Sequence, residues 1–429
     1  MSAEALRHPL LAEQSVDESS GCLYARAGEA VTFEPLRVEA GELLLPRAAD
    51  TEYRLALYTA GPEPRYIYTY SYPPEGNLTG FLPEASCFDW RRGPYRFPAT
   101  AHVRVIVRTR GETPAALEDC FDRQRGPEPP SASWIDEEAE RVARRVHRAR
   151  RDGDAVFLLL SDTHYAAGCN WGDTARSLAC VQTRIGAEGI LHLGDLTDGM
   201  LPAAWTERYT ARVTDDMHAL GLPVWGCLGN HDRNYFRGNT QPLSRLDCMR
   251  LCLGRDDPDY CVDRAEQRLR MIFLDSFEPE RRERYGFSKE TLKTFERMLR
   301  ETPEGWRVLV FSHLPPVARL HVWSDSILGS AEATGLLRRF QREHGGVLGW
   351  VHGHNHCDQI DRGEGFPIVA IGCSKLEAFP EYKPLGSVTP MRYPGEPRQE
   401  LWDVLLIHAR GDDFELIRYG AGADRYIHL

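Results

Sequence analysis

The region before about residue 110 alternates apolar and polar positions at a spacing of two. In the run HVRVIVR, Val103, Val105 and Val107 fall on one side and Arg104 and Arg108 on the other, which is typical of a half-buried strand. Gly, Pro and Asp separate this run from similar ones, namely AVTFEPLRVEA, EYRLALY and YIYTYSY. The pattern predicts a small all-β sandwich over residues 21–112, preceded by a flexible N-terminus over residues 1–20.

A linker and a long helix are expected next. Residues 113–133 are rich in Pro and charged side chains, which is typical of a linker. An apolar stripe at helical spacing then runs through Ile135, Ala139, Val142, Val146 and Ala149. Acids begin this segment and arginines end it, as the helix dipole favours. The arginines suggest nucleic-acid binding, but a solvated helix face is the simpler interpretation in an acidic chain.

From Asp154 onward, short apolar runs alternate with helical stretches. The runs are AVFLLLS, GILHLG, PVWGCLG, RMIFLDS, RVLVFSH and GVLGWVHG. Continuous apolar runs are expected of strands that are covered on both faces. With the strand-like segments LWDVLLIHAR and FELIRYG near the C-terminus, they predict an α/β domain over residues 134–429.

Composition narrows the class of protein. The 429 residues exceed what one hydrophobic core usually holds, roughly 250–300, so two domains are expected. No apolar run approaches the ~20 residues of a membrane span, and the N-terminus lacks an export signal, which favours a cytoplasmic protein. Eleven scattered cysteines favour reduced thiols, with Cys248 and Cys252 as small buried hydrophobes on one helix face. The net charge of −11 favours a small phosphorylated substrate over DNA or RNA.

Polar side chains directly follow five of the predicted strands. FLLL leads into SDTH, LHL into GDLTD, CL into GNHD, VLVFS into His313, and LGWV into HGHNH. Ligands of open α/β sheets bind beyond the carboxyl ends of the strands, so these side chains should converge. Each motif alone has an ordinary interpretation as a cap, a turn or a strand-end histidine. Their joint occurrence in this order favours a metal centre.

The series D-x-H, G-D-x-x-D, G-N-H-D, isolated His and G-H-x-H resembles the calcineurin-like metallophosphoesterase superfamily. The resemblance extends from about Phe157 to His356 and implies a two-sheet α/β/β/α sandwich. It implies one metal held by Asp162, His164 and His356, and a second held by Asn230, His313 and His354, with Asp195 between them. Such oxygen and imidazole ligands suit Mn, Fe or Zn.

The resemblance also separates subfamilies. Protein Ser/Thr phosphatases have an Arg after the second motif, where this chain has Gly199 and Met200, and purple acid phosphatases have a Tyr at the position of Asp198. What remains resembles the bacterial phosphodiesterases and phosphatases.

Further roles are expected around these ligands. Two cations about 3.5–4 Å apart would acidify a shared water, which attacks phosphorus in line. His231 is expected to protonate the leaving group. Asp198 and Asp232 are expected to orient His231 or a ligand imidazole, with a cap or turn role equally open. Tyr165 and His321 are the chosen substrate contacts, from a wider set that includes Tyr235 and Trp323, and His352 is interpreted as a strand residue.

Two other functions stay open beside a hydrolase of phosphate mono- or diesters. The first is a glycan or ligand binder with an inactive phosphoesterase scaffold, which would use Tyr66, Tyr68, Tyr70, Tyr72, Trp90 and Tyr95 as a stacking surface. The second is a single-strand nuclease, against which the acidic charge and the lack of a basic and aromatic run both argue. The sequence leaves the metal identity, the natural substrate and the oligomeric state open.

Overall fold

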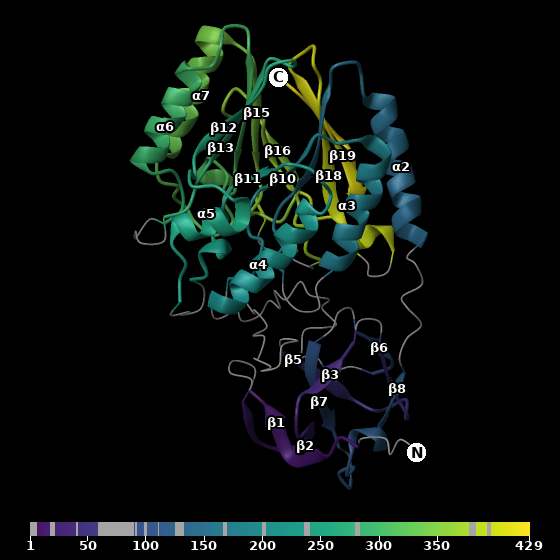
Figure 1. Ribbon diagram of the computed structural model, residues 1–429. Coiled ribbons are helices and arrows are strands. Elements are labelled where there is room, and N and C mark those ends of the chain that lie inside the picture. The colour runs from purple at the N-terminus through teal and green to yellow at the C-terminus, as the bar shows by residue number, and fades with distance from the viewer. Residues whose placement is uncertain are drawn as a thin grey trace. The chain divides into compact units, whose positions relative to one another are not determined.

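The structure is a computed structural model in which the chain forms two compact units (Figure 1). It describes residues 7–17, 22–39, 42–58, 90, 92–97, 101–109, 111–124, 133–165, 170–199, 203–235, 241–278, 284–376, 383–392 and 396–429. The N-terminal unit comprises Met1–Ser133 and Ala166–Asn170, and the C-terminal unit comprises Trp134–Tyr165 and Trp171–Leu429.

The N-terminal unit is built from two antiparallel sheets. The larger sheet contains β1 (Leu10–Val16), β2 (Leu23–Thr32), β3 (Leu36–Val38), β5 (Tyr53–Tyr58) and β7 (Ala101–Arg108). The smaller sheet contains β4 (Leu43–Pro46), β6 (Tyr95–Arg96) and β8 (Phe121–Gln124), and η1 (Leu117–Asp119) precedes β8. Val103, Val105 and Val107 are buried as the alternation predicts. Ile106 is buried too, in a second cluster with Val31, so β7 is covered on both faces.

This unit extends beyond the expected limits of 21 and 112. Strand β1 lies within the segment expected to be a flexible N-terminus, and β8 lies within the expected linker, where it pairs with β4. A register shift between Ala12 and Gln14 interrupts the period-two pattern of β1, which hides the strand from a periodicity argument. Strand β8 is only four residues long. The N-terminal segment therefore contains a strand within residues 1–20, and the linker contains a strand within residues 113–133.

The C-terminal unit contains two sheets of six strands. The first has the order β11 (Val224–Gly226), β10 (Gly189–His192), β9 (Ala155–Leu160), β18 (Leu401–Ile407), β19 (Asp413–Gly420), β20 (Arg425–His428). The second has the order β12 (Tyr260–Arg264), β13 (Leu269–Leu274), β14 (Arg307–Ser312), β15 (Val347–His352), β17 (Ile368–Ala370), β16 (Gln359–Asp361). Strands β9, β10 and β11 are parallel, as are β13, β14, β15 and β17, so each set has its carboxyl ends at one edge.

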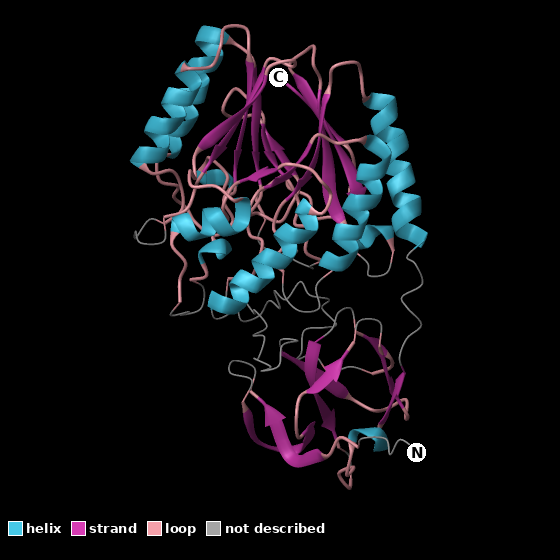
Figure 2. Cartoon of the chain, viewed as in Figure 1, coloured by secondary structure: helices cyan, strands magenta, loops and turns pink. Residues whose placement is uncertain are grey.

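Helices cover the outer faces of both sheets and also lie at one end of the strands (Figures 1 and 2). They are α2 (Ser133–Ala149), α3 (Trp171–Ile185), α4 (Ala203–His218), α5 (Arg245–Leu253), α6 (Lys289–Arg300) and α7 (Ser330–His344), with η2 (His231–Arg233), η4 (Ala318–Leu320) and η5 (Pro397–Gln399) as short 3-10 turns. Apolar side chains of α6 and α7 form one core with β13, β14 and β15. On the opposite side, Tyr419 of β19 donates to the Ile135 carbonyl of α2, and Trp402 of β18 donates to Ser177 of α3. The two-sheet α/β/β/α sandwich is thereby confirmed.

Most of the expected elements of this unit are present. The six apolar runs after Asp154 and the two near the C-terminus are all strands, and residues 133–149 are helical. The short strands β12, β16, β17 and β20 were not predicted. Cys248 and Cys252 are buried on α5 without a disulfide, as expected of packing residues. Among the described residues, no helix has the length and apolar character needed to cross a membrane.

Candidate metal centre

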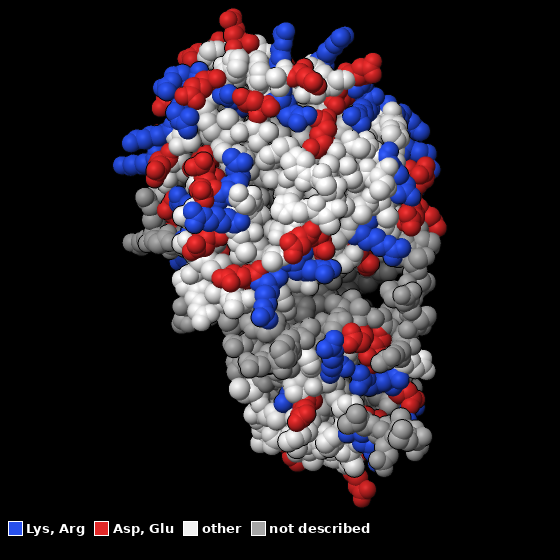
Figure 3. All heavy atoms as spheres, viewed as in Figure 1, with Lys and Arg blue, Asp and Glu red and all other residues white. Residues whose placement is uncertain are grey.

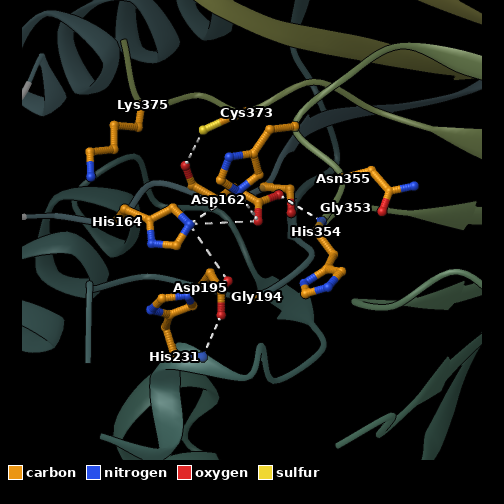
Figure 4. Close-up of polar contacts among 12 residues, drawn as sticks. Asp162, His164, Gly194, Asp195, His231, Gly353, His354, Asn355, Cys373 and Lys375 are labelled. Carbon is orange, nitrogen blue, oxygen red and sulfur yellow. Dashed lines mark hydrogen bonds and ion pairs between the residues drawn. The ribbon is translucent and has the colours of Figure 1, made fainter. Parts of the chain in front are cut away.

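Each of the five motifs lies just beyond the carboxyl end of a strand. Asp162 and His164 follow β9, Asp195 follows β10, Asn230 follows β11, His313 follows β14, and His354 and His356 follow β15. All seven side chains are buried or nearly so. Figure 4 shows Asp162 and His164 beside Asp195, with His354 approaching from the other side. The fold therefore brings together residues that span almost 200 positions of the sequence.

The donor atoms form two adjoining clusters. In the first, His356 Nε2 is 3.1 Å from Asp162 Oδ1 and 3.2 Å from His164 Nε2. In the second, His313 Nε2 is 3.2 Å from Asp195 Oδ2, 3.0 Å from Asn230 Oδ1 and 3.1 Å from His354 Nδ1.

Asp195 joins the clusters, because its Oδ2 is also 3.6 Å from His164 Nε2. Asp162 with His164 and His356, and Asp195 with His313 and His354, are two of the groups whose spacing could hold a metal ion.

The spacing and chemistry of these atoms fit cation binding. Two ligand atoms about 2.1 Å from one cation, at an angle of about 90–110°, lie roughly 3.0–3.4 Å apart. The closest distances within both clusters fall in this range. The Nδ1–H of His313 donates to the Leu193 carbonyl at 2.7 Å, which leaves the lone pair of Nε2 directed into the second cluster.

The backbone of the site adopts an uncommon conformation. Five of the eight described non-glycine residues with positive φ belong to the two clusters: Asp162, His164, Asp195, His354 and His356, at 55°, 42°, 58°, 64° and 51°. Each left-handed residue of this kind costs about 1–3 kcal/mol unless its surroundings hold it in place. Strain concentrated in this way marks a functional site.

Hydrogen bonds between the loops hold these conformations. The backbone N–H groups of Asp162 and His164 donate to the carbonyls of Gly194 and Asp195, both at 2.9 Å. The Asp162 carboxylate accepts from the His354 N–H at 3.0 Å, and the Asp195 carboxylate accepts from the His231 N–H at 2.7 Å. Four motifs are therefore connected by backbone hydrogen bonds and by the two carboxylates that face the donor clusters.

Glycines permit this close approach. A Cβ at Gly229 would lie 2.0 Å from Asp195 Oδ1, and one at Gly353 would lie 1.9 Å from Ser161 Oγ. Any side chain at either position would push the loops apart, which explains why the motifs containing Asn230 and His354 begin with glycine.

The family follows from the sequence comparison. Residues 155–358 match the family model described as calcineurin-like phosphoesterase. These residues form a calcineurin-like phosphoesterase domain. The resemblance inferred from the motifs is confirmed over these residues, and the match supports a metal-dependent phosphoesterase. No curated protein sequence matches the chain significantly.

Solved structures resemble the phosphoesterase domain more distantly. A dimetal phosphatase from Danio rerio is 18% identical with a TM-score of 0.48, and the match covers 64% of this chain and 98% of that chain. GAP50, the anchor in the inner membrane complex of Plasmodium, is 11% identical with a TM-score of 0.42, over 64% of this chain and 89% of that chain. Both TM-scores are below 0.5, so we draw no conclusion about activity or substrate from them.

Charges within the phosphoesterase domain balance one another. Burial opposes ionisation of Asp162 and Asp195, yet nearby imidazoles lower the pKa of Asp195 to about 2 and hold the pKa of Asp162 further below its usual value. Burial likewise opposes charging of His313, but the Asp195 and Asp162 carboxylates raise the pKa of His313 to about 9. A cation bound at the second cluster would therefore compete with a proton on His313.

His231 lies at the rim of the two clusters. Its Nδ1–H donates to the Asp198 carbonyl at 2.7 Å, and its Nε2 is 4.0 Å from Asp195 Oδ2. Burial lowers the pKa of His231 to about 4, although the Asp195 and Asp198 charges act in the opposite direction. The contact to His231 therefore comes from the main-chain carbonyl of Asp198, whereas the prediction concerned its carboxylate.

Asp198 and Asp232 act on different partners. Asp198 Oδ1 is 3.2 Å from His164 Nδ1, so the carboxylate faces a histidine of the first cluster. Asp232 instead accepts hydrogen bonds from the backbone N–H groups of Asp195, Leu196 and Gly229. These bonds favour the turn interpretation of Asp232. Burial and the Asp195 charge raise the pKa of the Asp232 carboxyl to about 7.

The sequence analysis missed Lys375. Its Nζ is 3.1 Å from Asp198 Oδ1, and its side chain is buried at the site (Figure 4). Arg392 donates to the carbonyls of Cys373, Ser374 and Lys375, which holds this segment in place. Lys375 also follows a strand, β17, whose apolar run FPIVAIG was the available signal.

The expected substrate contacts differ in their surroundings. Tyr165 is half-buried and its ring packs edge-on against Tyr209 at 4.9 Å. His321 is buried, with its ring centroid 4.8 Å from that of His354, so it borders the second cluster. His352 ends β15 and belongs to none of the metal-type groups among the described residues, in agreement with its interpretation as a strand residue.

Proposed function

We propose that the chain is a hydrolase that binds two metal ions and cleaves phosphate monoesters or diesters of a small molecule. The observation that carries this proposal is the pair of adjoining clusters. In each cluster, imidazole, carboxylate or amide atoms are separated by about the distance expected between two ligand atoms of one cation. Asp162, His164 and His356 would hold one ion, Asn230, His313 and His354 the other, and Asp195 would contact both. Mn, Fe and Zn all suit this donor set.

The residues around the clusters have separable tasks. When bound, the two ions would supply Lewis acidity and acidify a water at the site. His231 would have to be in its imidazolium form to transfer a proton from Nε2 to the leaving oxygen, because its Nδ1–H is already committed to the Asp198 carbonyl. The negative phosphate of a bound substrate would favour that form. The Asp198 carboxylate would keep the proton of His164 on Nδ1 and so leave Nε2 for the ion.

The alternative functions receive less support. Tyr95 is buried against Phe97, and the Trp90 ring is contacted by the guanidinium groups of Arg54 and Arg108, so neither offers an open stacking face. The other proposed glycan contacts, Tyr66 to Tyr72, lie outside the described residues. On the face drawn in Figure 3, basic and acidic side chains are interspersed over the C-terminal unit, unlike the basic stripe of a nucleic-acid binder.

The domain organisation and the cellular location are also proposed from the sequence. We propose that the β-rich N-terminal unit and the phosphoesterase unit fold as separate domains. The odd number of scattered cysteines remains the argument for a cytoplasmic location.

Hydrolysis of p-nitrophenyl phosphate and bis-p-nitrophenyl phosphate, with Mn, Fe or Zn added to the full chain, tests the proposed function. Turnover should require metal and should fall about 10²–10⁴-fold in His231→Ala, as expected when a general acid is lost. Asn230→Ala should lose metal at the second cluster as well as activity. The exposed His344 on α7 provides the control variant His344→Ala, which should match the wild type. A purified protein that binds none of these metals and hydrolyses neither ester would refute the proposal.

A further inference from the structure

A group of aromatic rings borders the second donor cluster. The Trp323 ring centroid is 4.7 Å from that of His354 and 6.1 Å from that of His356. The His321 ring lies 4.8 Å from His354, and Tyr285 lies 4.8 Å from His321. We call Tyr235, Tyr285, His321 and Trp323 the aromatic wall.

The wall is assembled from separate loops. Tyr235 follows η2, Tyr285 lies between β13 and α6, and His321 and Trp323 follow η4. Buried Phe277 links the two tyrosines, at ring distances of 5.2 Å to Tyr235 and 5.7 Å to Tyr285. Tyr235, Tyr285 and Trp323 are themselves only half-buried, which distinguishes them from Phe277 and from rings that pack within the core. The Arg284 guanidinium lies over the Tyr235 ring at 5.7 Å, so stacking is assigned to Tyr285 and Trp323. Partly exposed aromatic rings beside a binding site are typical of a stacking surface.

His321 adds a hydrogen-bond donor to the wall. The Trp323 backbone N–H donates to His321 Nδ1 at 3.0 Å, so a neutral His321 carries its proton on Nε2. Within the described part of the chain, Nε2 is buried and has no hydrogen-bond partner, although the whole residue is only 8% exposed. Buried donors of this kind are normally satisfied, so this one requires an acceptor from a ligand or a water.

We propose that the aromatic wall binds a planar aromatic group of the phosphorylated substrate, an aryl ring or a nucleobase, while the phosphate lies at the donor clusters. This inference rests on the proposed function and narrows its substrate class. Stacking on one such ring typically changes affinity by about tenfold. A saturated ring of the same size fills the same space but presents no π face, so it isolates the stacking contribution.

Benzylphosphonate and cyclohexylmethylphosphonate form the matched pair of probes, since neither is hydrolysed and they differ only in the aromaticity of the ring. We expect calorimetric titration of the Mn²⁺-loaded full chain to show about tenfold tighter binding of benzylphosphonate. Trp323→Leu and, separately, Tyr285→Leu should reduce this preference to about twofold and leave the cyclohexylmethyl compound nearly unaffected. Tyr426→Leu, at a 51% exposed tyrosine on β20, is the control and should retain the preference.

Adenosine and thymidine monophosphates distinguish a nucleobase from a simple aryl ring, and they are titrated into the His231→Ala variant. If the wall binds a nucleobase, these nucleotides should bind more tightly than benzylphosphonate. Equal binding of the two phosphonates, or an equal loss of both in Trp323→Leu and Tyr285→Leu, would overturn the inference. Inorganic phosphate separates the two proposals: if phosphate binds and the ring preference is missing, only the aromatic wall is wrong. If phosphate, phosphonates and nucleotides all fail to bind, the proposed function fails with it.

Discussion

Replacing Lys375 with methionine tests how the first donor cluster is supported. The variant keeps most of the side-chain volume and removes the charge that lies 3.1 Å from Asp198 Oδ1. The Lys375 side chain is 7% exposed and that of Asp198 is 19% exposed, so the pair is largely shielded from water.

Breaking a buried pair by removing one partner typically costs about 3–5 kcal/mol. The partial exposure of Asp198 places this pair near the lower limit, at about 3 kcal/mol, which corresponds to roughly 6–12 °C in the melting temperature of a domain of this size class.

The same substitution should weaken metal binding. Asp198 faces His164 Nδ1 at 3.2 Å, so a carboxylate without its cation would orient the imidazole less well. Loss of such outer contacts typically lowers metal affinity by about 10–100-fold. Because Lys375 acts through Asp198, we expect about tenfold, measured by titration with Mn²⁺ and by the absorption spectrum of the Co²⁺-loaded protein.

Two further variants make this test specific. Lys375→Arg retains the charge and should recover most of both losses. Lys293→Met removes an exposed lysine on α6 and should change neither. If Lys375→Met melts and binds Mn²⁺ like the wild type, the reasoning about the Lys375 and Asp198 pair is refuted.

Three more predictions concern stability. Arg418 is fully buried, 2.7 Å from Asp358 and 2.9 Å from Asp403, so Arg418→Met should destabilise the protein by about 3–5 kcal/mol in urea titration, whereas a similar change at exposed Arg410 should have little effect. Burial and the Asp275 charge raise the pKa of Asp259 to about 7; the folded state therefore holds the extra proton between about pH 4 and pH 7, and stability should fall as the pH rises through this window. Asp259→Asn should remove up to roughly 1.4 kcal/mol per pH unit of that slope, and an unchanged slope in urea midpoints at pH 5, 6 and 7 would contradict the assignment. Mn²⁺ at about 100 times its dissociation constant should stabilise the protein by about 2.7 kcal/mol, an effect that a chelator should reverse in calorimetry.

The sequence predicted the C-terminal unit well because its strands are covered on both faces. Runs such as FLLL and VLVF contain no polar position, and residues 155–160 and 307–312 are buried throughout. Strands whose apolar pattern is irregular or very short were not predicted from the sequence. The bulge in β1 breaks its alternation, and β16 and β17 have three residues each, too few for any periodicity to be recognised.

The donor residues were predictable for a different reason. Asp162, Asn230 and His354 stand within motifs that directly follow strands, so the topology alone brings them to one edge. Lys375 follows a strand as well, but a single lysine has no motif and its partner Asp198 is 177 positions away in sequence.

The role of Asp232 could not be read from its neighbours either. A carboxylate beside a histidine is equally able to orient the ring or to accept backbone N–H groups, and only the packing of the loops at Asp195 and Gly229 decides between these roles.

The left-handed backbone at Asp162, His164, Asp195, His354 and His356 has a consequence for how ions enter and leave. Hydrogen bonds between the loops hold these dihedral angles. Ion uptake then requires only the loss of water and protons, with no ordering of loops. We therefore expect one metal to exchange for another while the tertiary structure stays intact, at rates that reflect the hydration of the incoming ion.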